Sequence, residues 1–549
     1  MKLNLKRMLK ALLLPLLFLF VIQQVKAQNK TITGTVSDER NNPVPGATVT
    51  VKGTSVATAA DSMGTFSITV PASAKTLVIS SVGYTNQEVS IGSKTSITIT
   101  LASPSQALTD VVVVGYGTAR KKDLTGSVST ISSKDFNQGP ITNPLQQIGG
   151  RAAGVNVSQT GSEPGSSPSV RIRGITSLIG GNDPLVVVDG IQGNLDLFRQ
   201  VPPSEIESID VLKDASATAI YGSRGAPGVI IVTTRKGRAG TTSIEYSGSA
   251  SVDMIPKKLD MLNAAEWGQQ ATKWGVPSSA NFGANTNWYD LLTRTGLTQN
   301  HTLAFGGGTN TFSYRASLTA ILQSGVVINS NFKNYIGRIQ ATQKALDNKL
   351  TLTMNLNSGI TNTLGSPNSG VGKAAFRSNL ITQSYISRPT DPIYKPDGTY
   401  FVDNNVFEYL NPYGFAQTVV NNGLTNNLFG SLRTDLELVK GLTAGWFGSW
   451  RKVDENSGYY LPAKSTDANA IRNNGIANIT NKRQDEKLMD ISLNYRKNFG
   501  DHNLGATAVY EWQNQTYQGN YAQAKGFLND ITTYNALQNG DLSKASPGI

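Results

Sequence analysis

Long segments in which apolar and polar residues alternate dominate the chain from about residue 242 onward. In residues 428–438 the even positions are mainly leucine, while the odd positions include serine, arginine, aspartate and glutamate. Residues 311–320 and 489–497 repeat this scheme. Strands of about 10 residues with one apolar and one polar face are typical of a membrane β-barrel around a wet lumen. We therefore expect residues 242–549 to form antiparallel transmembrane strands.

A large soluble β-sandwich is the alternative, but its strands are usually about 5–6 residues long. Tyr and Trp near the strand ends also favour a membrane barrel. Short turns, such as Lys440-Gly441, separate some strands, whereas long polar stretches at 362–427 and 453–486 separate others. Short turns on one side and long loops on the other are the outer-membrane pattern.

The first 27 residues have the layout of a cleaved secretory signal. Positive residues from Lys2 to Lys10 precede an apolar run, Ala11 to Ile22, and Val25-Lys26-Ala27 offers a cleavage site. A membrane anchor is the alternative, but this run is shorter than the roughly 20 residues that span a bilayer. We therefore predict a signal peptide at 1–27, cleaved after Ala27.

The whole-chain composition narrows the class of protein further. The chain has no Cys, although exported proteins often carry disulfides, and a barrel closed by backbone hydrogen bonds does not need them. The net charge of +12 is not gathered into basic clusters with interleaved aromatics, so we expect no nucleic-acid binding. A mean hydropathy of −0.21 argues against a helical membrane protein.

Three segments precede the alternating region. Residues 29–103 hold short strands at roughly ten-residue spacing, separated by turn residues, which predicts a β-sandwich. Residues 106–118 form an isolated extended run with four consecutive valines. Such a strand is either an ordinary buried strand or one that pairs with a sheet edge of another protein, and both alternatives stay open. Residues 119–238 form a Gly-rich α/β segment.

Turn and cap residues divide the α/β segment into elements. A strand ending at Val188 is followed by Asp189-Gly190, which predicts a tight turn. Ser204 and Glu207 fit a capping box. Asp214 is expected to cap a short helix, Ala215 to Tyr221, that Gly222 ends.

These motifs, in this order, resemble the SusC/RagA family of TonB-dependent outer-membrane transporters, which is typical of Bacteroidetes. The resemblance covers residues 1–240, where 31–101 resemble a carboxypeptidase regulatory-like domain and 119–238 a plug domain. The most specific motif runs from Ile206 to Gly222, and one departure is Pro227, where the family more often has Asn. The stretch that resembles the TonB box consists of Asp110, Val111, Val112, Val113, Val114, Gly115, Tyr116 and Gly117. The plug-motif residues are Arg171, Arg173, Gly174, Asp189, Gly190, Lys213, Asp214, Tyr221, Gly222 and Gly228.

The resemblance implies a receptor for energised nutrient uptake in the outer membrane of a Gram-negative cell. Its implied partners are TonB with its inner-membrane motor, a SusD-like surface lipoprotein, an oligosaccharide or peptide substrate, and outer-membrane lipid. The fold class is then mainly β, with an N-terminal β-sandwich, an α/β plug and an incomplete antiparallel transmembrane β-barrel. A barrel of about 22 strands needs roughly twice the residues available after 240, so we expect a fragment.

The resemblance also implies how the plug is held. Charged plug residues are expected to pair with the charged face of the lumen, because polar contacts cost less to break than an apolar core. This hypothesis loses its support if Arg171 and Arg173 face only the core of the plug.

Other functions are less consistent with the sequence. A zinc carboxypeptidase needs closely spaced His and Glu ligands, but the chain has two histidines, His301 and His502, far apart. We expect no catalytic residue, metal or cofactor. A surface receptor or adhesin without transport remains the alternative, and the strand at 110–117 argues against it. A transporter that also signals would carry a further N-terminal domain, for which the sequence leaves no room.

Overall fold

The computed structural model describes residues 29–548, except for 39–41, 72–73, 82–83, 85, 93, 102–110, 115–116, 121–126, 138, 140, 160–162, 180, 239, 241, 366–379, 407–408, 501 and 542–545. The predicted signal peptide, its cleavage after Ala27, and Asp110, Gly115 and Tyr116 lie outside these residues. The chain divides into two compact units at Val111. Each unit is described by itself.

The first unit is a small β-sandwich. One sheet has the order β4-β1-β7, and the other has the order β3-β2-β5-β6. Alternate residues of both sheets, among them Ile32, Val49 and Ile79, share one buried core. The sequence did not indicate the short strands at 57–59 and 87–90, because the first has only three residues and the second has a single apolar residue, Val89. The strands are β1 Lys30–Asp38, β2 Thr48–Val51, β3 Ala57–Ala59, β4 Thr65–Val70, β5 Thr76–Ser80, β6 Gln87–Ser90 and β7 Ser96–Leu101.

A two-stranded sheet of β8 (Val111–Val114) and β9 (Gly117–Arg120) follows, and all of it after Val111 belongs to the second unit. The valine run is therefore a strand, as predicted. Its described partner is the segment that directly follows it.

An α/β domain follows, built on a five-stranded sheet of order β10-β15-β16-β13-β14. Strand β13 runs parallel to β16, and the other neighbours are antiparallel. A separate hairpin joins β11 to β12. The elements are β10 Val128–Ser132, β11 Val155–Ser158, β12 Ser169–Ile172, β13 Leu185–Val188, β14 Ile191–Gly193, α2 Leu195–Arg199, β15 Ile206–Leu212, α3 Ala215–Thr218 and β16 Val229–Thr234, with 3₁₀ helices at Ser133–Asp135, Pro144–Gln147, Pro203–Glu205 and Ala219–Gly225.

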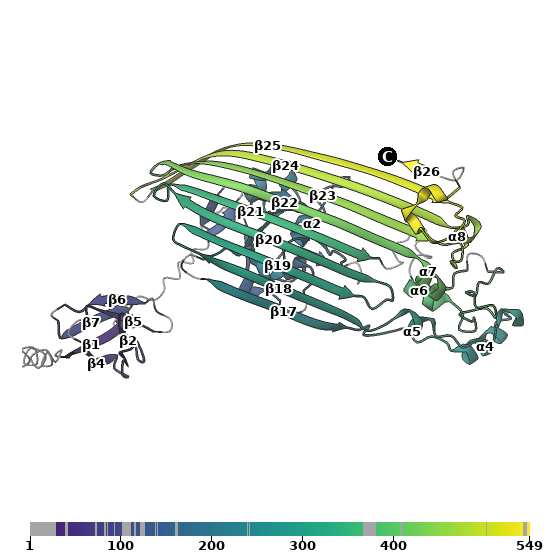
Figure 1. Ribbon diagram of the computed structural model, residues 1–549, viewed down its shortest axis with the longest axis horizontal. Helices are drawn as coiled ribbons and strands as arrows, with labels where there is room; N and C mark the ends of the chain where they lie inside the picture. Colours follow the sequence, from purple (N-terminus) through teal and green to yellow (C-terminus); the bar gives the residue numbers. More distant parts are fainter. Residues whose placement is uncertain are drawn as a thin grey trace, which may run out of the picture. The chain divides into compact units, whose positions relative to one another are not determined.

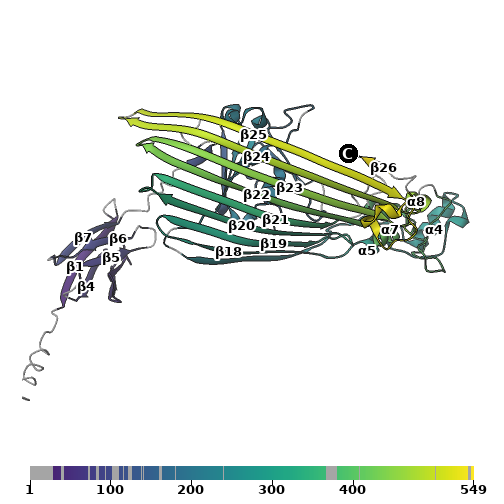
Figure 2. The same ribbon diagram turned by 45° about the horizontal axis from the view of Figure 1, so that its top comes forward.

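A ten-stranded antiparallel sheet, which we call the wall sheet, forms the rest of the unit. Its strands pair in chain order from β17 to β26, and the α/β domain lies behind the sheet in both Figure 1 and Figure 2. Among the described residues, β17 does not pair with β25 or β26. The strands are β17 Ser243–Asp253, β18 Gly296–Gly308, β19 Phe312–Ser324, β20 Asn331–Ala345, β21 Leu350–Leu364, β22 Val420–Val439, β23 Leu442–Leu461, β24 Ile476–Phe499, β25 His502–Lys525 and β26 Ser546–Gly548.

The alternation predicted for the wall sheet is confirmed by the exposure of its side chains. On β19, Leu318 is 64% exposed, whereas Arg315 is 6% and Thr319 is 4% exposed. On β24, Ile491 is 51% exposed and Asp490 is 7% exposed. The apolar face therefore points outward, and the polar face points toward the α/β domain.

Several wall strands are longer than the sequence predicted. Strands β22 to β25 have 20 to 24 residues, and most of 453–486, predicted as a loop, is strand in β23 and β24. The long loop predicted at 362–427 is shortened likewise, to 365–419. The reason is that these extensions carry polar residues on both faces, so the apolar alternation that marks a strand is absent there.

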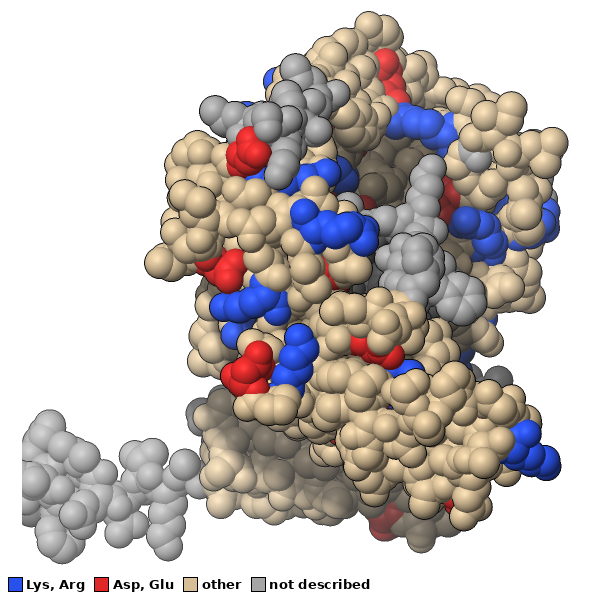
Figure 3. All heavy atoms as spheres, turned by 90° about the vertical axis from the view of Figure 1, so that its right-hand side faces the viewer, with Lys and Arg blue, Asp and Glu red and all other residues tan. Residues whose placement is uncertain are grey.

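The connections at one end of the wall sheet are short turns, such as 309–311 and 346–349, and most of those at the other end are long. The long connections hold helices α4 Ala264–Lys273, α5 Trp288–Leu292, α6 Leu380–Ile386, α7 Pro412–Thr418 and α8 Ala468–Arg472. Some of these helices share a buried core that includes Leu292, Leu380 and Phe415. We call this the helical end. Viewed from that side, most of the surface is uncharged, with scattered basic and acidic side chains around a hollow (Figure 3). No described helix is long and apolar enough to cross a membrane.

Candidate functional site

The most elaborate polar cluster in the second unit lies between the α/β domain and the wall sheet. The fold brings three residues of the α/β domain to one end of its sheet. Strand β13 ends at Val188, opposite Val232 of the parallel strand β16. The next residues are therefore Asp189 after β13 and Thr234 at the end of β16, while antiparallel β15 begins beside Thr234, directly after Glu205.

Two successive residues in the left-handed backbone conformation orient the carboxylate of Asp189. Asp189 has φ +48° and Gly190 has φ +92°, so the predicted tight turn is confirmed. Residues with positive φ at both central positions form the hairpin turn that matches strand twist. The Asp189 carboxylate then accepts a hydrogen bond from the backbone N of Thr234 at 3.0 Å.

Glu205 is the centre of the cluster. Its side chain is 1% exposed, and Arg315 of β19 donates to both of its oxygens, from Nε at 2.9 Å and from Nη2 at 2.8 Å. Arg315 also donates to Glu245 of β17 at 3.0 Å. A bidentate arginine–carboxylate pair is among the stronger and more directional protein hydrogen-bond arrangements. Arg315 therefore links the α/β domain to β19 and, through Glu245, to β17, which lies on the other side of β18.

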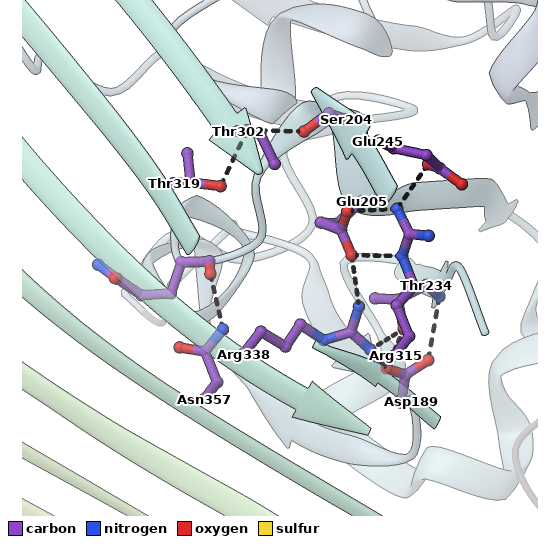
Figure 4. Close-up of polar contacts among 11 residues, drawn as sticks. Asp189, Ser204, Glu205, Thr234, Glu245, Thr302, Arg315, Thr319, Arg338 and Asn357 are labelled. Atoms are coloured by element: carbon purple, nitrogen blue, oxygen red, sulfur yellow. Dashed lines mark hydrogen bonds and ion pairs between the residues drawn. The ribbon is translucent and has the colours of Figure 1, made fainter. Parts of the chain in front are cut away.

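Arg338 of β20 makes a second link. Its Nη2 donates to Asp189 at 2.9 Å and also contacts the hydroxyl of Thr234, while its Nη1 lies 3.8 Å from Glu205. Figure 4 shows the two arginines reaching from the wall toward Glu205 and Asp189. Arg315, Arg338, Glu205 and Asp189 are hereafter called the clamp. Its two arginines come from the wall and its two carboxylates from the α/β domain, so separating the two parts leaves Glu205 and Asp189 without their arginine partners, while Arg315 keeps Glu245 of the wall.

Further polar contacts surround the clamp. Ser204 lies 3.0 Å from Thr302, which lies 2.9 Å from Thr319, and Asn357 donates to the backbone O of Gln200 at 3.0 Å (Figure 4). Away from the clamp, Arg224 and Gln192 both bind Glu511 of β25 at 2.8 Å.

Apolar contacts also join the two parts. The side chains of Phe429, Phe447 and Leu488 extend from the wall into the main hydrophobic core of the α/β domain. The expectation of a mainly polar interface is therefore incomplete, since three buried wall residues belong to an apolar core that separation would expose.

A cavity of about 660 Å³ lies between the α/β domain and the wall near the clamp. Asp189, Gly190 and Tyr221 line it from the domain, and Gln340 and Asn355 from the wall. The Gln340 amide and the Asn355 carbonyl have no hydrogen-bond partner within the described chain. A polar cavity of this size can hold water, which lowers the cost of breaking nearby polar contacts.

The structure separates the predicted plug-motif residues into two groups. Asp189 and Gly190 face the wall, and a Cβ on Gly190 would lie 3.2 Å from the ring of Phe447. Arg171 pairs with Asp183, and Arg173 pairs with Asp214, both within the α/β domain and partly exposed. These two arginines therefore give no support to the plug–wall hypothesis, although they do not lie in the core. Its support comes from Glu205, Asp189 and Arg224.

The side chains of Lys213 and Asp214 form hydrogen bonds with residues near the start of the α/β domain. The Lys213 ammonium donates to the Ser129 hydroxyl at 2.7 Å and to the Ala153 O at 2.8 Å. Asp214 occupies the N-cap of α3 but makes no capping hydrogen bond, so that prediction is wrong in detail. Its carboxylate instead accepts from Ser127 N, and this bond lowers the pKa of Asp214.

The remaining motif residues shape the backbone. Gly174 has φ +96° and Gly222 has φ +59°. Gly222 interrupts a 3₁₀ helix, Ala219–Gly225, that follows α3. Gly228 has φ +96°, and a Cβ there would lie 2.7 Å from Ile172. Burial raises the pKa of the Tyr221 hydroxyl.

The predicted capping box at Ser204 and Glu207 is also wrong. The 3₁₀ helix Pro203–Glu205 has Pro202 at its N-cap, without a side-chain cap. The Ser204 hydroxyl contacts Thr302 of the wall instead, and this tertiary contact replaces the local one.

The sequence did not single out the wall partners of the clamp. Arg315 and Arg338 each lie on the inward face of an alternating strand, which is the one signal that could have marked them. A charged residue that points into a lumen has many possible partners, so the pairing depends on the fold. Among the described residues, no cluster of His, Asp and Glu is suited to a metal ion.

Two family models match the chain. The CarboxypepD_reg-like domain matches residues 32–114, and the TonB-dependent Receptor Plug Domain matches residues 120–229.

Curated relatives match most of the chain. A TonB-dependent receptor of Formosa agariphila is 33% identical over 95% of this chain and 52% of its own length. TonB-dependent receptor SusC of Bacteroides thetaiotaomicron is 34% identical over 74% of this chain and 40% of its own length. The chain thus spans about half the length of the curated relatives that it matches.

A solved structure shares the fold. The RagAB peptide importer in the open-open state superposes with a TM-score of 0.67 at 24% identity, over 80% of this chain and 52% of that chain. This likeness concerns the fold alone and supports the arrangement of an α/β domain against a barrel wall.

Proposed function

We propose, from the premise that this chain is a homologue of SusC-like TonB-dependent receptors, that the protein is an outer-membrane transporter for energised nutrient uptake. Its α/β domain is the plug of the pore, and the wall sheet is part of the barrel. The observation that supports this most strongly is the clamp, which holds the plug to the wall through contacts that are buried but largely polar.

The strand β8 is the element on which the force acts in this proposal. Residues 110–117 are released into the periplasm and add as a strand to a sheet of TonB. Strand addition uses main-chain hydrogen bonds, so it joins the two proteins firmly whatever most of the side chains are. The pairing of β8 with β9 in the resting chain is consistent with a segment that forms sheet hydrogen bonds readily.

The substrate proposed is an oligosaccharide or a peptide, delivered with a SusD-like surface lipoprotein as partner. Support for this class comes from the relatives, which include SusC and the structure described as a peptide importer. A surface receptor without transport is the competing function, and the test below separates the two.

The experiment uses the full-length protein with its lipoprotein partner in cells, and a panel of labelled glycans and peptides. Deleting residues 110–117 is expected to leave surface binding intact and to abolish uptake. Uptake that is unchanged by the deletion would overturn energised transport and favour a binding receptor.

A finer variant tests strand addition itself. Val112→Pro with Val114→Pro removes two backbone donors and fixes φ, which disrupts pairing. The matched control replaces the same valines with Thr, which keeps a β-branched side chain and the donors. We expect uptake to be lost with Pro and kept with Thr.

A further inference from the structure

A groove of about 690 Å³ lies on the outward face of the wall sheet, near the helical end. On the same strands, Arg338, Asn357 and Phe429 face the α/β domain. Most of the groove residues, among them Lys333, Asn362 and Asn422, lie at an odd number of positions from these, so alternation puts their side chains on the opposite, outward face.

The strand register brings the groove residues into two adjacent rows across β20 to β24. One row contains Lys333, Asn362, Leu424, Asn456 and Asn481, and the next contains Asn331, Leu364, Asn422, Gly458 and Ile479.

The connection after β25 forms one side of the groove. Its Tyr534 ring lies against Gly458, where an added Cβ would come within 2.2 Å of the ring. The amide of Asn422 donates to the Tyr534 hydroxyl at 3.0 Å. Asn535 lines the groove beside Tyr534. The absence of a side chain at position 458 therefore lets an aromatic ring stand at the groove.

The groove is lined by six asparagines. The side chains of Asn362 and Asn456 are exposed and make no hydrogen bond within the described chain. Each amide offers two donors and a carbonyl acceptor, and adjacent hydroxyls of a sugar ring present the complementary groups. Lys333 adds one positive charge. The chemistry of the groove thus fits a saccharide.

The outward face of the wall sheet has three successive bands along its strands: an apolar belt, a band of paired charges, and the groove. Their order indicates that the saccharide belongs to a lipid. Met354, Leu432 and Met489 form one cross-strand row of an apolar belt, which ends at Trp450. The next residues along β23 and β24 are charged and paired, as with Asp454 and Arg483. The groove follows, about 20 Å from Trp450 at about 3.3 Å per residue.

We propose that the groove binds the saccharide head group of a glycolipid in the outer leaflet. Its acyl chains contact the belt, its charged groups meet the paired band, and its sugars fill the amide rows. The proposal requires the membrane placement of the wall sheet, but it does not require TonB, the plug or transport.

The test is lipid retention by the full-length protein, read by native mass spectrometry and by binding in nanodiscs. The probe is phosphatidylethanolamine with a minor fraction of rough-type lipooligosaccharide, compared with phosphatidylethanolamine alone. Asn362→Leu with Asn456→Leu removes two amides at nearly constant size. The matched control is Asn514→Leu, an outward-facing asparagine on β25 outside the groove.

We expect the double variant to lower glycolipid retention by about tenfold, as two lost hydrogen bonds predict, and the control to leave it unchanged. The free oligosaccharide of the same glycolipid should bind more weakly than the intact molecule. Equal retention by the double variant and the wild type would overturn the proposal, as would equal affinity for the free oligosaccharide or equal retention of phosphatidylethanolamine. Uptake measured in parallel is expected to stay dependent on residues 110–117, which separates this outcome from failure of the transport proposal.

Discussion

Glu205 has the most constrained carboxylate of the clamp, because two arginines approach it and 1% of its side chain is exposed. Glu205→Gln removes the charge but keeps the shape. Breaking a buried ion pair from one side costs about 3–5 kcal/mol, since the partner charge stays buried. We expect faster hydrogen exchange in β15 and β16, measured on the full-length protein by mass spectrometry.

The control for that change is Glu207→Gln, two residues away on an exposed side chain. It removes the same charge without touching the clamp, so exchange should match the wild type. Equal exchange in both variants would show that the clamp does not hold the plug.

A substitution at Gly190 tests the turn that orients the carboxylate of Asp189. Gly190→Ala places a Cβ at φ +92° and 3.2 Å from Phe447. The left-handed conformation alone costs about 1–2 kcal/mol for a residue with a Cβ. We expect a lower midpoint of thermal unfolding. Gly505→Ala on β25 is the control, because a Cβ there meets nothing within 4 Å, and an equal loss in both would refute the account of the turn.

At the residue scale, the sequence predicted local conformations better than contacts. The Asp189-Gly190 turn follows from the residues themselves and is present. Ser204 and Asp214 were expected to cap helices, but each binds a group distant in sequence instead. A capping residue is predicted from its neighbours in sequence alone. The prediction fails where a group distant in sequence offers the side chain a better-placed hydrogen-bond partner.

At the scale of elements, the alternation of apolar and polar residues predicted the wall strands but not the residues at which they end. The prediction depends on an apolar outward face, which exists only within the belt. Beyond it, β23 and β24 continue as polar strands through paired side chains such as Lys482 with Glu455 and Arg451 with Glu486. Polar strands of this kind have no hydropathy signature, so 453–486 was expected to be loop.

The long connection between β21 and β22 carries its own buried charge cluster at the helical end. Arg388 pairs with Asp391 at 3.0 Å and with Asp403. Burial raises the pKa of Asp391, and the hydrogen bond from Tyr409 and the charge of Arg388 oppose that rise. Arg388→Gln therefore leaves Asp391, which is 0% exposed, without its cation.

We expect this variant to lose exchange protection over residues 384–406 near neutral pH. Because the pKa of Asp391 is raised in the folded loop, the folded state binds the proton more tightly than the unfolded state. Stability must then rise as pH falls through that pKa. Protection in the variant should therefore recover partly at acidic pH, measured by exchange corrected for intrinsic rates, and a further loss at acidic pH would contradict this assignment.

At the scale of the whole second unit, the division into α/β domain and wall followed from the sequence, but their interlock did not. Arg315 and Glu205 are 110 residues apart, and Arg338 and Asp189 are 149 apart. Which inward residue meets which plug residue depends on strand register and on the position of the plug. Neither is contained in the periodicity of a single strand.

In the proposed transport, the plug must move relative to the wall for uptake. These 549 residues contain no cysteine, so an engineered pair introduces the first two thiols into this part of the protein. Ser204 of the plug and Thr302 of β18 suit such a pair, because their hydroxyl oxygens lie 3.0 Å apart. Ser204→Cys with Thr302→Cys in the full-length protein can therefore tether the plug beside the clamp, and either single variant is the control.

The decisive measurement is substrate uptake by cells that carry this pair, with surface binding followed in parallel. We predict that oxidation abolishes uptake without changing binding, that reduction restores it, and that neither single variant responds. Equal uptake in the oxidised and reduced states, with the crosslink verified, would contradict the account.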